Sequence, residues 1–405
     1  MSQFRAFIAG GWRRPEVLLF LMAGAVPMSF ATWQALLNNF AIERVAFSGA
    51  DMGVLQSIRE VPGFLAFAVV FLLFVMREQT LALVALLLLG IGTALTGWFP
   101  SVLGLWFTTI VMSLGYHYYA TVEMSLALQW TEKDRTAVML GRLIAVGSAT
   151  SIVAFGLIWL AFDTAELDFR WVYMIGGGVT VAVVAVGWLI FPRFPEKVEQ
   201  RRRMVLRKRY WLYYLLTFLS GARRQIFVVF AGFLMVEKFG YTVGEIALLF
   251  LLNATINMWL APRVGRLIAR WGERRALIFE YGGLVFVFTG YAFVEHAGLA
   301  AALYVVDHLF FALAIALTTY LQKIADRADI ASTAGVSFSI DHTAAVIVPA
   351  SFGLLWLVSP AAVFLAGAAL AAVSLALSFN VPARSEPGNE VVLGLRGATV
   401  PTPAE

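Results

Sequence analysis

The sequence predicts an all-α membrane protein with 12 transmembrane helices, arranged as two six-helix bundles around a central cavity. Hydrophobic residues make up 60% of the 405 residues and charged residues 14%, against roughly 45–50% and about 25% in soluble proteins. Twelve apolar blocks are long enough to cross a bilayer, which takes about 20 residues. The longest polar break divides them six and six. This composition argues against a soluble enzyme, because one domain of this size could not bury so much apolar surface.

Short charged connections separate the twelve blocks and mark their boundaries. In chain order the blocks cover residues 15–37, 52–76, 79–98, 102–128, 137–161, 171–191, 211–235, 244–261, 276–294, 299–322, 333–357 and 361–380. The first block is too long for the apolar core of a signal peptide and lacks a clear small-residue cleavage site. We therefore expect it to be a permanent helix.

Basic residues predict the orientation of the chain. With the N-terminus in the cytoplasm, 23 of the 30 Lys and Arg fall on the cytoplasmic side, and only Arg44, Arg170 and Lys238 fall on the opposite side. Cytoplasmic loops of membrane proteins carry such an excess. The distribution predicts a multi-pass protein of the cytoplasmic (inner) membrane with both termini in the cytoplasm.

The polar segments predict the domain organisation. Residues 1–192 form the N-terminal bundle and residues 210–382 the C-terminal bundle. The segment 193–209, RFPEKVEQRRRMVLRKR, joins them as a basic cytoplasmic linker suited to anionic lipid headgroups. Residues 383–405 are rich in Pro, Gly and polar residues, so we expect a flexible cytoplasmic tail.

The segment RVGRLIARWGERR at residues 263–275, between the eighth and ninth blocks, resembles the cytoplasmic loop signature of the major facilitator superfamily. Twelve spans and a basic central linker are similar to that family too. The resemblance implies a monomer whose first, fourth, seventh and tenth spans line the cavity. It also implies a gating role for the loop residues Gly265, Arg266, Arg270, Glu273, Arg274 and Arg275, with Gly265 allowing close helix approach. The corresponding loop in the first half of the chain matches the signature poorly, and the Gly-Pro pair typical of antiporters is missing. The motifs therefore do not indicate the direction of transport.

Ionisable side chains inside the blocks are the candidate functional residues, because such groups are costly in a bilayer and mark transport pathways. For substrate binding we expect Arg223, Arg224, His117, Tyr116 and Asn38, with Arg223 favoured of the two arginines because small residues precede it. For proton coupling we expect Asp307 with His308, Asp341 with His342, and Glu123. For gating we expect Arg59, Glu60 and Arg142 in addition to the loop. Glu280 lies one turn into the ninth block and is expected to reach the membrane interface.

These residues favour a proton-coupled secondary transporter of a small organic anion or zwitterion, working by alternating access. The buried arginines suit an anionic substrate group, and carboxylates and histidines suit proton coupling. The sequence has no cysteine and no Walker A motif, and we expect no enzymatic activity, no cofactor and no nucleic-acid partner. The alternatives are a multidrug-type exporter and a carrier of a transition metal or metal chelate, with His117, His308 and His342 as possible ligands.

Overall fold

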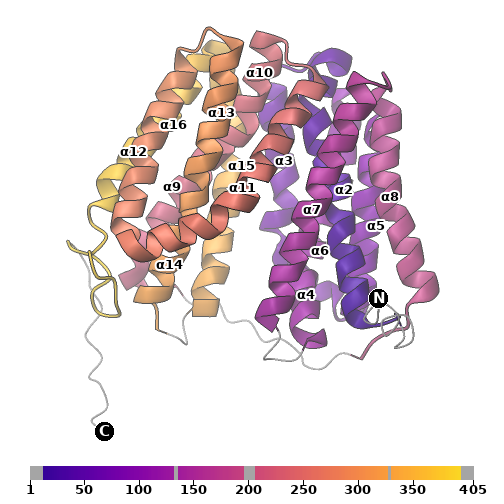
Figure 1. The fold of residues 1–405 in the computed structure, drawn as a ribbon, viewed down its shortest axis with the longest axis horizontal. Coiled ribbons are helices and arrows are strands. Elements are labelled where there is room, and N and C mark those ends of the chain that lie inside the picture. The colour runs from indigo at the N-terminus through magenta and orange to yellow at the C-terminus, as the bar shows by residue number, and fades with distance from the viewer. Residues whose placement is uncertain (1–11, 132–135, 196–205, 327–329, 394–405) are drawn as a thin grey trace. The chain divides into compact units, whose positions relative to one another are not determined.

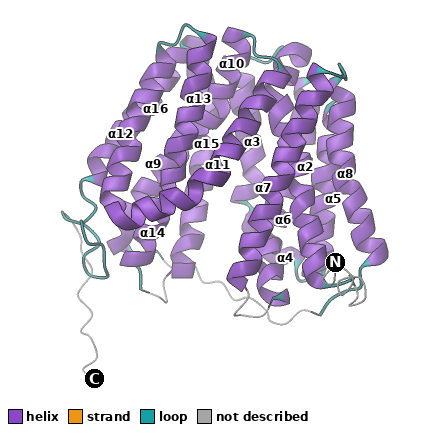
Figure 2. Cartoon of the chain, in the orientation of Figure 1, coloured by secondary structure: helices purple, strands orange, loops and turns teal. Residues whose placement is uncertain are grey.

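The computed structural model describes residues 12–131, 136–195, 206–326 and 330–393. In this part of the chain, helices joined by loops make up the structure, with one isolated bridge between Glu386 and Asn389 (Figure 2). Most of the predicted linker, together with the last twelve residues of the predicted tail, lies outside the described residues. The helices follow one another in the order shown in Figure 1.

The first half of the chain contains α2 (Pro15–Val45), α3 (Gly49–Phe64), η1 (Ala66–Ala68), α4 (Val69–Leu72), α5 (Glu78–Thr96), α6 (Val102–Trp130), α7 (Thr136–Asp163) and α8 (Phe169–Ile190). The second half contains η2 (Lys208–Tyr210), α9 (Trp211–Ile226), η3 (Phe227–Ala231), α10 (Gly232–Phe239), α11 (Val243–Trp271), α12 (Glu273–Ala292), α13 (Ala297–Phe311), η4 (Ala312–Ala314), α14 (Ile315–Ile324), α15 (Ile330–Val358) and α16 (Pro360–Ser378).

Each predicted block coincides with helical structure. Within the described residues, nine helices are long and apolar enough to cross a membrane. The blocks at 52–76, 102–128 and 276–294 are not among the nine: the first is interrupted at residue 65, and the other two carry polar side chains along α6 and α12. The multi-pass all-α class is confirmed, and the number twelve stays a prediction.

Helix ends follow local chemistry. Ser101 and Ser359 accept hydrogen bonds from the backbone N–H groups of Gly104 and Ala362 at the starts of α6 and α16, as serines at this position commonly do. The eighth predicted block was expected to end at residue 261, but α11 continues to Trp271. Gly272, with φ of +81°, then separates α11 from α12, because glycine adopts this conformation without a steric penalty.

Contacts divide the chain into two compact units. The first contains residues 1–47, 58–200 and 241–254, and the second contains residues 48–57, 201–240 and 255–405. Each unit therefore takes a short stretch from the opposite half of the chain. In the second unit this stretch is the start of α3, where Gly53 approaches the backbone of Pro349 and Gly353.

In the first unit, α5 packs against both α6 and α8, and α2 packs against α7 and α8. Gly90 on α5 and Gly177 on α8 lie against each other's backbone, so no larger side chain fits between these helices. Such small residues are common where membrane helices approach closely. In the second unit, α9 packs against α15 and α12 against α16.

The start of the predicted flexible tail is ordered, which differs from the expectation. Residues 381–393, which we call the C-terminal strap, fold back onto the second unit, and Glu390 and Val391 are fully buried. The Tyr320 hydroxyl donates a hydrogen bond to the backbone carbonyl of Glu390. Asn380 holds the far end of the strap through hydrogen bonds with Leu393, Nδ2 to O at 2.9 Å and N to Oδ1 at 2.6 Å.

Candidate functional site

Ionisable residues inside the predicted spans gather in three groups, two of them buried and one partly exposed. The Arg223 cluster comprises Arg223, Glu280, Tyr281 and Asp307 in the second unit. The Arg224 pair comprises Arg224 and Asp341 in the same unit. The Arg59 cluster comprises Arg59, Glu60, Ser113 and His117 in the first unit. Since a charge is expensive to bury unless it is paired, the partners of each group decide what it can do.

Arg223 and Arg224 are neighbours on α9 with different surroundings. Successive helical residues point about 100° apart, so the two guanidinium groups leave the helix in different directions. The side chain of Arg223 is 5% exposed and that of Arg224 is 38% exposed. Of the two arginines, Arg224 is therefore the partly exposed one, although the sequence favoured Arg223 for substrate binding.

Arg223 is held by α12. Its Nη2 lies 3.2 Å from Oε1 of Glu280, and its guanidinium lies over the Tyr281 ring, 4.7 Å from the centroid. Glu280 is 1% exposed, so the expectation that it reaches the membrane interface is wrong. Its side chain turns inward because the buried guanidinium on α9 compensates its charge.

Asp307 on α13 completes the Arg223 cluster. Its carboxylate is 4% exposed and close enough to Arg223 and Glu280 to interact electrostatically with both. It forms no hydrogen bond or ion pair with another residue in the described part of the chain. Asp307 is thus a buried carboxyl group without a dedicated partner.

Arg224 pairs with Asp341 of α15, Nη2 to Oδ2 at 3.1 Å, and the Asp341 side chain is 25% exposed. Gly221 makes this possible: a Cβ at position 221 would lie 2.5 Å from Oδ1 of Asp341. The pair therefore joins α9 to α15 through a charged contact that is partly exposed.

The histidines predicted for proton coupling, His308 and His342, are each anchored by their own helix. Nδ1 of His308 lies 3.0 Å from the carbonyl oxygen of Tyr304, and Nδ1 of His342 lies 2.9 Å from that of Phe338. The His308 ring also packs against Phe227, with centroids 5.4 Å apart. Within the second unit, the structure brings Asp307 together with Arg223 and Glu280, and the proton-coupling roles predicted for both histidines stay predictions.

The Arg59 cluster joins α3 to α6. Arg59 forms an ion pair with its neighbour Glu60, and Nε2 of His117 lies 3.7 Å from the other carboxylate oxygen of Glu60. The hydroxyl of Ser113 donates to the backbone carbonyl of Arg59 and lies 3.0 Å from Nδ1 of His117. Sequence reasoning missed Ser113, whose signal was its position one turn before His117.

Aromatic residues of α2 and α6 lie beside the Arg59 cluster. The Arg59 guanidinium lies over the Trp33 ring at 5.7 Å, and Tyr116 stacks on Phe30 at 4.3 Å between centroids. Asn38 is buried, but its neighbour Asn39 makes the long-range contact, donating to the carbonyl oxygen of Tyr241 at 2.7 Å.

Glu123 also lies on α6, where its carboxylate accepts a hydrogen bond from the hydroxyl of Tyr119 at 3.0 Å. This contact is local to the helix, one turn apart.

The signature residues lie at the junction of α11 and α12. Glu273 is buried and pairs with Lys323, Oε1 to Nζ at 2.7 Å. Gly265 is exposed, and a Cβ added there would meet no described atom within 4 Å, so it does not serve the close helix approach expected of it. The remaining predicted gating residues are Arg266, Arg270 and Arg275, which are exposed, Arg274, which is partly buried, and Arg142, which is exposed on α7.

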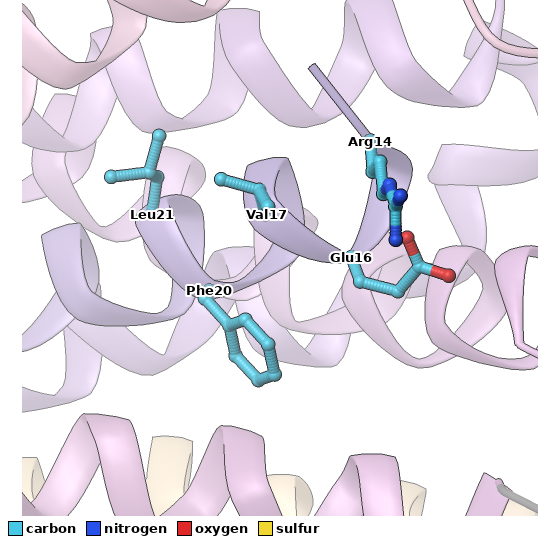
Figure 3. Close-up of a pocket in the computed structure, with 5 residues that line it drawn as sticks. All are labelled: Arg14, Glu16, Val17, Phe20 and Leu21. Carbon is cyan, nitrogen blue, oxygen red and sulfur yellow. The ribbon is translucent and has the colours of Figure 1, made fainter. Parts of the chain in front are cut away.

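A pocket of about 450 Å³ opens at the start of α2, lined by Arg14, Glu16, Val17, Phe20 and Leu21. Figure 3 shows the Arg14 guanidinium turned toward the Glu16 carboxylate, with the apolar side chains further along the helix. None of the predicted site residues lines this pocket.

The comparisons with known proteins agree on one fold. The family model of the Major Facilitator Superfamily matches residues 17–349. The nucleoside transporter NupG is similar with a TM-score of 0.72 and 14% identity, over 90% of this chain and 97% of that one. No curated protein matches the chain significantly.

Two further solved structures are similar. A bacterial homologue of the human lysosomal transporter Spinster has a TM-score of 0.73 and 13% identity, over 90% of this chain and 95% of that one. A POT family peptide transporter has a TM-score of 0.69 and 12% identity, over 90% of this chain and 96% of that one.

Proposed function

Because the chain belongs to the major facilitator superfamily and is a transporter rather than an enzyme, we propose that it is a proton-coupled secondary transporter of a small organic anion or zwitterion. It works by alternating access between two six-helix bundles. It acts as a monomer in the cytoplasmic membrane, with both termini in the cytoplasm. The observation that carries the substrate class is the accessible Arg224 pair.

Arg224 is the anion-binding residue. A guanidinium binds a carboxylate or phosphate through two parallel hydrogen bonds, and Arg224 is the arginine of the α9 pair that is partly exposed. Arg223, with its side chain 5% exposed and paired with Glu280, is not available to a solute without rearrangement.

Asp341 competes with the substrate for Arg224. Its carboxylate occupies the place that a substrate carboxylate would take, at 3.1 Å from Nη2. Protonation of Asp341 would release the guanidinium, so proton binding and anion binding favour each other at this pair. His342 follows Asp341 on α15 and is its relay to neighbouring groups.

Binding measurements test the substrate class. Purified protein is heated with lactate, succinate, alanine, uridine, a dipeptide, an apolar cation, Zn²⁺ or Ni²⁺, since a ligand bound only by the native state raises the melting temperature. We expect a shift with at least one carboxylate-bearing solute in the wild type and none with Arg224→Ala. Glu245→Gln, an exposed change in the first turn of α11, serves as the control that keeps the shift.

Other results would favour other functions. A shift confined to uncharged solutes such as uridine, or one retained in Arg224→Ala, contradicts the anion assignment. A shift with the apolar cation alone supports the multidrug-type exporter. A shift with Zn²⁺ or Ni²⁺ alone supports the carrier of metals.

A further inference from the structure

The Arg223 cluster contains one more acid than base. Arg223 is 4% exposed, Glu280 1% and Asp307 4%. One guanidinium therefore faces two carboxyl groups that are shielded from solvent, and with both carboxyls ionised the cluster would carry one uncompensated negative charge. Such a charge is too costly to bury in the apolar part of a membrane protein.

The hydrogen bonds of Arg223 show which carboxyl group its guanidinium contacts. Nη2 of Arg223 donates to Oε1 of Glu280 at 3.2 Å. Nη1 of Arg223 and Oε2 of Glu280 have no hydrogen-bond partner within the described residues. The guanidinium thus has a free donor, and Asp307 is the nearby carboxyl group that lacks a partner.

From this charge count we infer that Arg223, Glu280 and Asp307 form a site that binds one proton, held by Asp307 in the state seen here. The inference rests on the proposed function and adds to that transport cycle a proton site separate from Asp341. When the proton leaves, the free Nη1 of Arg223 is the donor available to the Asp307 carboxylate. Protonation therefore decides whether Arg223 is held by α12 alone or shared between α12 and α13.

The neighbouring ionisable groups do not alter the balance of one base and two acids in the Arg223 cluster. Tyr281 lies beneath the guanidinium, and Tyr304 lies one turn before Asp307. His308 is anchored on the Tyr304 carbonyl, and Lys323 is paired with Glu273, the first residue of α12. The Arg224 pair is neutral in itself, and α16, which packs against α12, carries no ionisable residue.

The chemistry of the site favours a proton over a metal cation. Hard cations prefer several oxygen ligands, whereas here the two carboxyl groups share the site with a guanidinium and with the rings of Tyr281 and Tyr304. A positive guanidinium beside the carboxyls repels a second cation. A proton, in contrast, binds to a single carboxyl oxygen.

Infrared difference spectroscopy tests the site without any substrate. Full-length protein in lipid is titrated between acidic and basic pH, and the carbonyl stretch of protonated carboxyl groups is recorded. We expect the wild type to lose one such component as the pH rises. Asp307→Asn lacks it because the acid is gone, and Glu280→Gln lacks it because Asp307 is then paired one-to-one with Arg223.

The variants separate the proton site from a structural role. Each single substitution leaves one acid and one base in the cluster, so both variants should fold. If Glu280→Gln does not fold, the spectrum of Asp307→Asn alone tests the inference. Glu237→Gln, which removes a carboxyl of the same unit that accepts from Trp356 Nε1 at 3.0 Å, is the control that keeps the component.

Two results would overturn the inference. One is a component that persists unchanged in Asp307→Asn. The other is a wild-type component that disappears on adding Na⁺ at constant pH. Neither depends on substrate transport, so a failure of the proposed anion transport and a failure of this proton site are distinguishable.

Discussion

At the scale of single residues, two adjacent arginines on one helix have different surroundings. Arg223 turns toward the acids of α12 and α13, while Arg224 meets Asp341 where the protein is partly open. The helical rotation of about 100° per residue is enough to separate a buried ion pair from a partly exposed one.

Replacing each arginine by lysine tests whether Arg224 binds the substrate while Arg223 only balances buried charge. Lysine is a poor substitute where a planar, two-point contact is needed, so Arg224→Lys should weaken anion binding about tenfold, roughly 1.4 kcal/mol. Arg223→Lys should leave affinity nearly unchanged and lower the melting temperature, because it disturbs a buried ion pair. Titration of both variants with the solute identified by thermal shift measures this. Equal affinities for Arg224→Lys and the wild type would exclude direct substrate contact.

Gly221 controls the geometry of the Arg224 pair. In Gly221→Ala the new Cβ would lie 2.5 Å from Oδ1 of Asp341, closer than real Cβ contacts come, so the carboxylate must move away. We expect altered anion affinity and a changed dependence of that affinity on pH. Gly282→Ala on α12 is the matched control, since a Cβ there meets nothing within 4 Å. Identical binding curves for the two variants would show that Gly221 has no such role.

The sequence predicted some of these residues and not others. Arg223, Arg224, Asp307 and Asp341 were predicted because charges inside apolar blocks are rare and costly. Which arginine is accessible depends on the rotation of α9 against its neighbours, which one sequence does not give. Glu280 obeys the same rule, but it was assigned to the interface because it lies near the start of α12.

At the scale of elements, two of the helices that carry the charged groups, α9 and α13, are followed directly by a change of helix type. The seventh predicted span changes to a π-helical turn at Phe227–Ala231, directly after α9, and the tenth has a 3₁₀ turn at Ala312–Ala314, directly after α13. Turns of this kind often occur at functional sites or hinges. The periodicity of apolar residues predicts helix over both regions and does not show the change of helix type.

The C-terminal strap should stabilise the end of the second unit on which it packs. Arg209 joins it there, with Nη2 2.5 Å from Oδ2 of Asp326 and Nη1 3.9 Å from Oε1 of Glu390. A chain ending at Asn380 loses the buried Val381 and Val391, and burying one Val is worth about 1.5 kcal/mol or more. We expect its melting temperature to fall by roughly 5 °C or more.

A chain ending at Leu393 is the control for this truncation, since it keeps the strap and removes only residues 394–405. It should melt like the full-length protein. If both truncated chains melt at the wild-type temperature, the strap contributes no stability.

At the scale of the whole molecule, composition and apolar blocks were enough to predict the class. The predicted resemblance to the major facilitator superfamily is confirmed by the family match over residues 17–349, and the fold is that of solved transporters with 12–14% identity. The fold class can be predicted even at low sequence identity because it depends on the lengths of the apolar segments and on the positions of the charged residues. Which side chains pair between helices leaves no comparable pattern in the sequence and could not be predicted in the same way.

The orientation can be tested directly because the chain has no cysteine. Thr164, in the exposed loop between α7 and α8, should be outside the cell, and Ala383, exposed at the start of the strap, should be inside. We expect an impermeant thiol reagent to label Thr164→Cys but not Ala383→Cys in intact cells, and both in lysed cells. Labelling of Ala383→Cys in intact cells would reverse the predicted topology.

The central claim is that transport of an organic anion is driven by protons bound in the second unit. It is tested most directly in proteoliposomes that take up the carboxylate-bearing solute found by thermal shift, with and without an imposed pH gradient. The account predicts that the wild type accumulates the solute only with the gradient, and that Asp307→Asn still exchanges solute across the membrane but no longer accumulates it. Accumulation by Asp307→Asn with the pH dependence of the wild type would contradict the account.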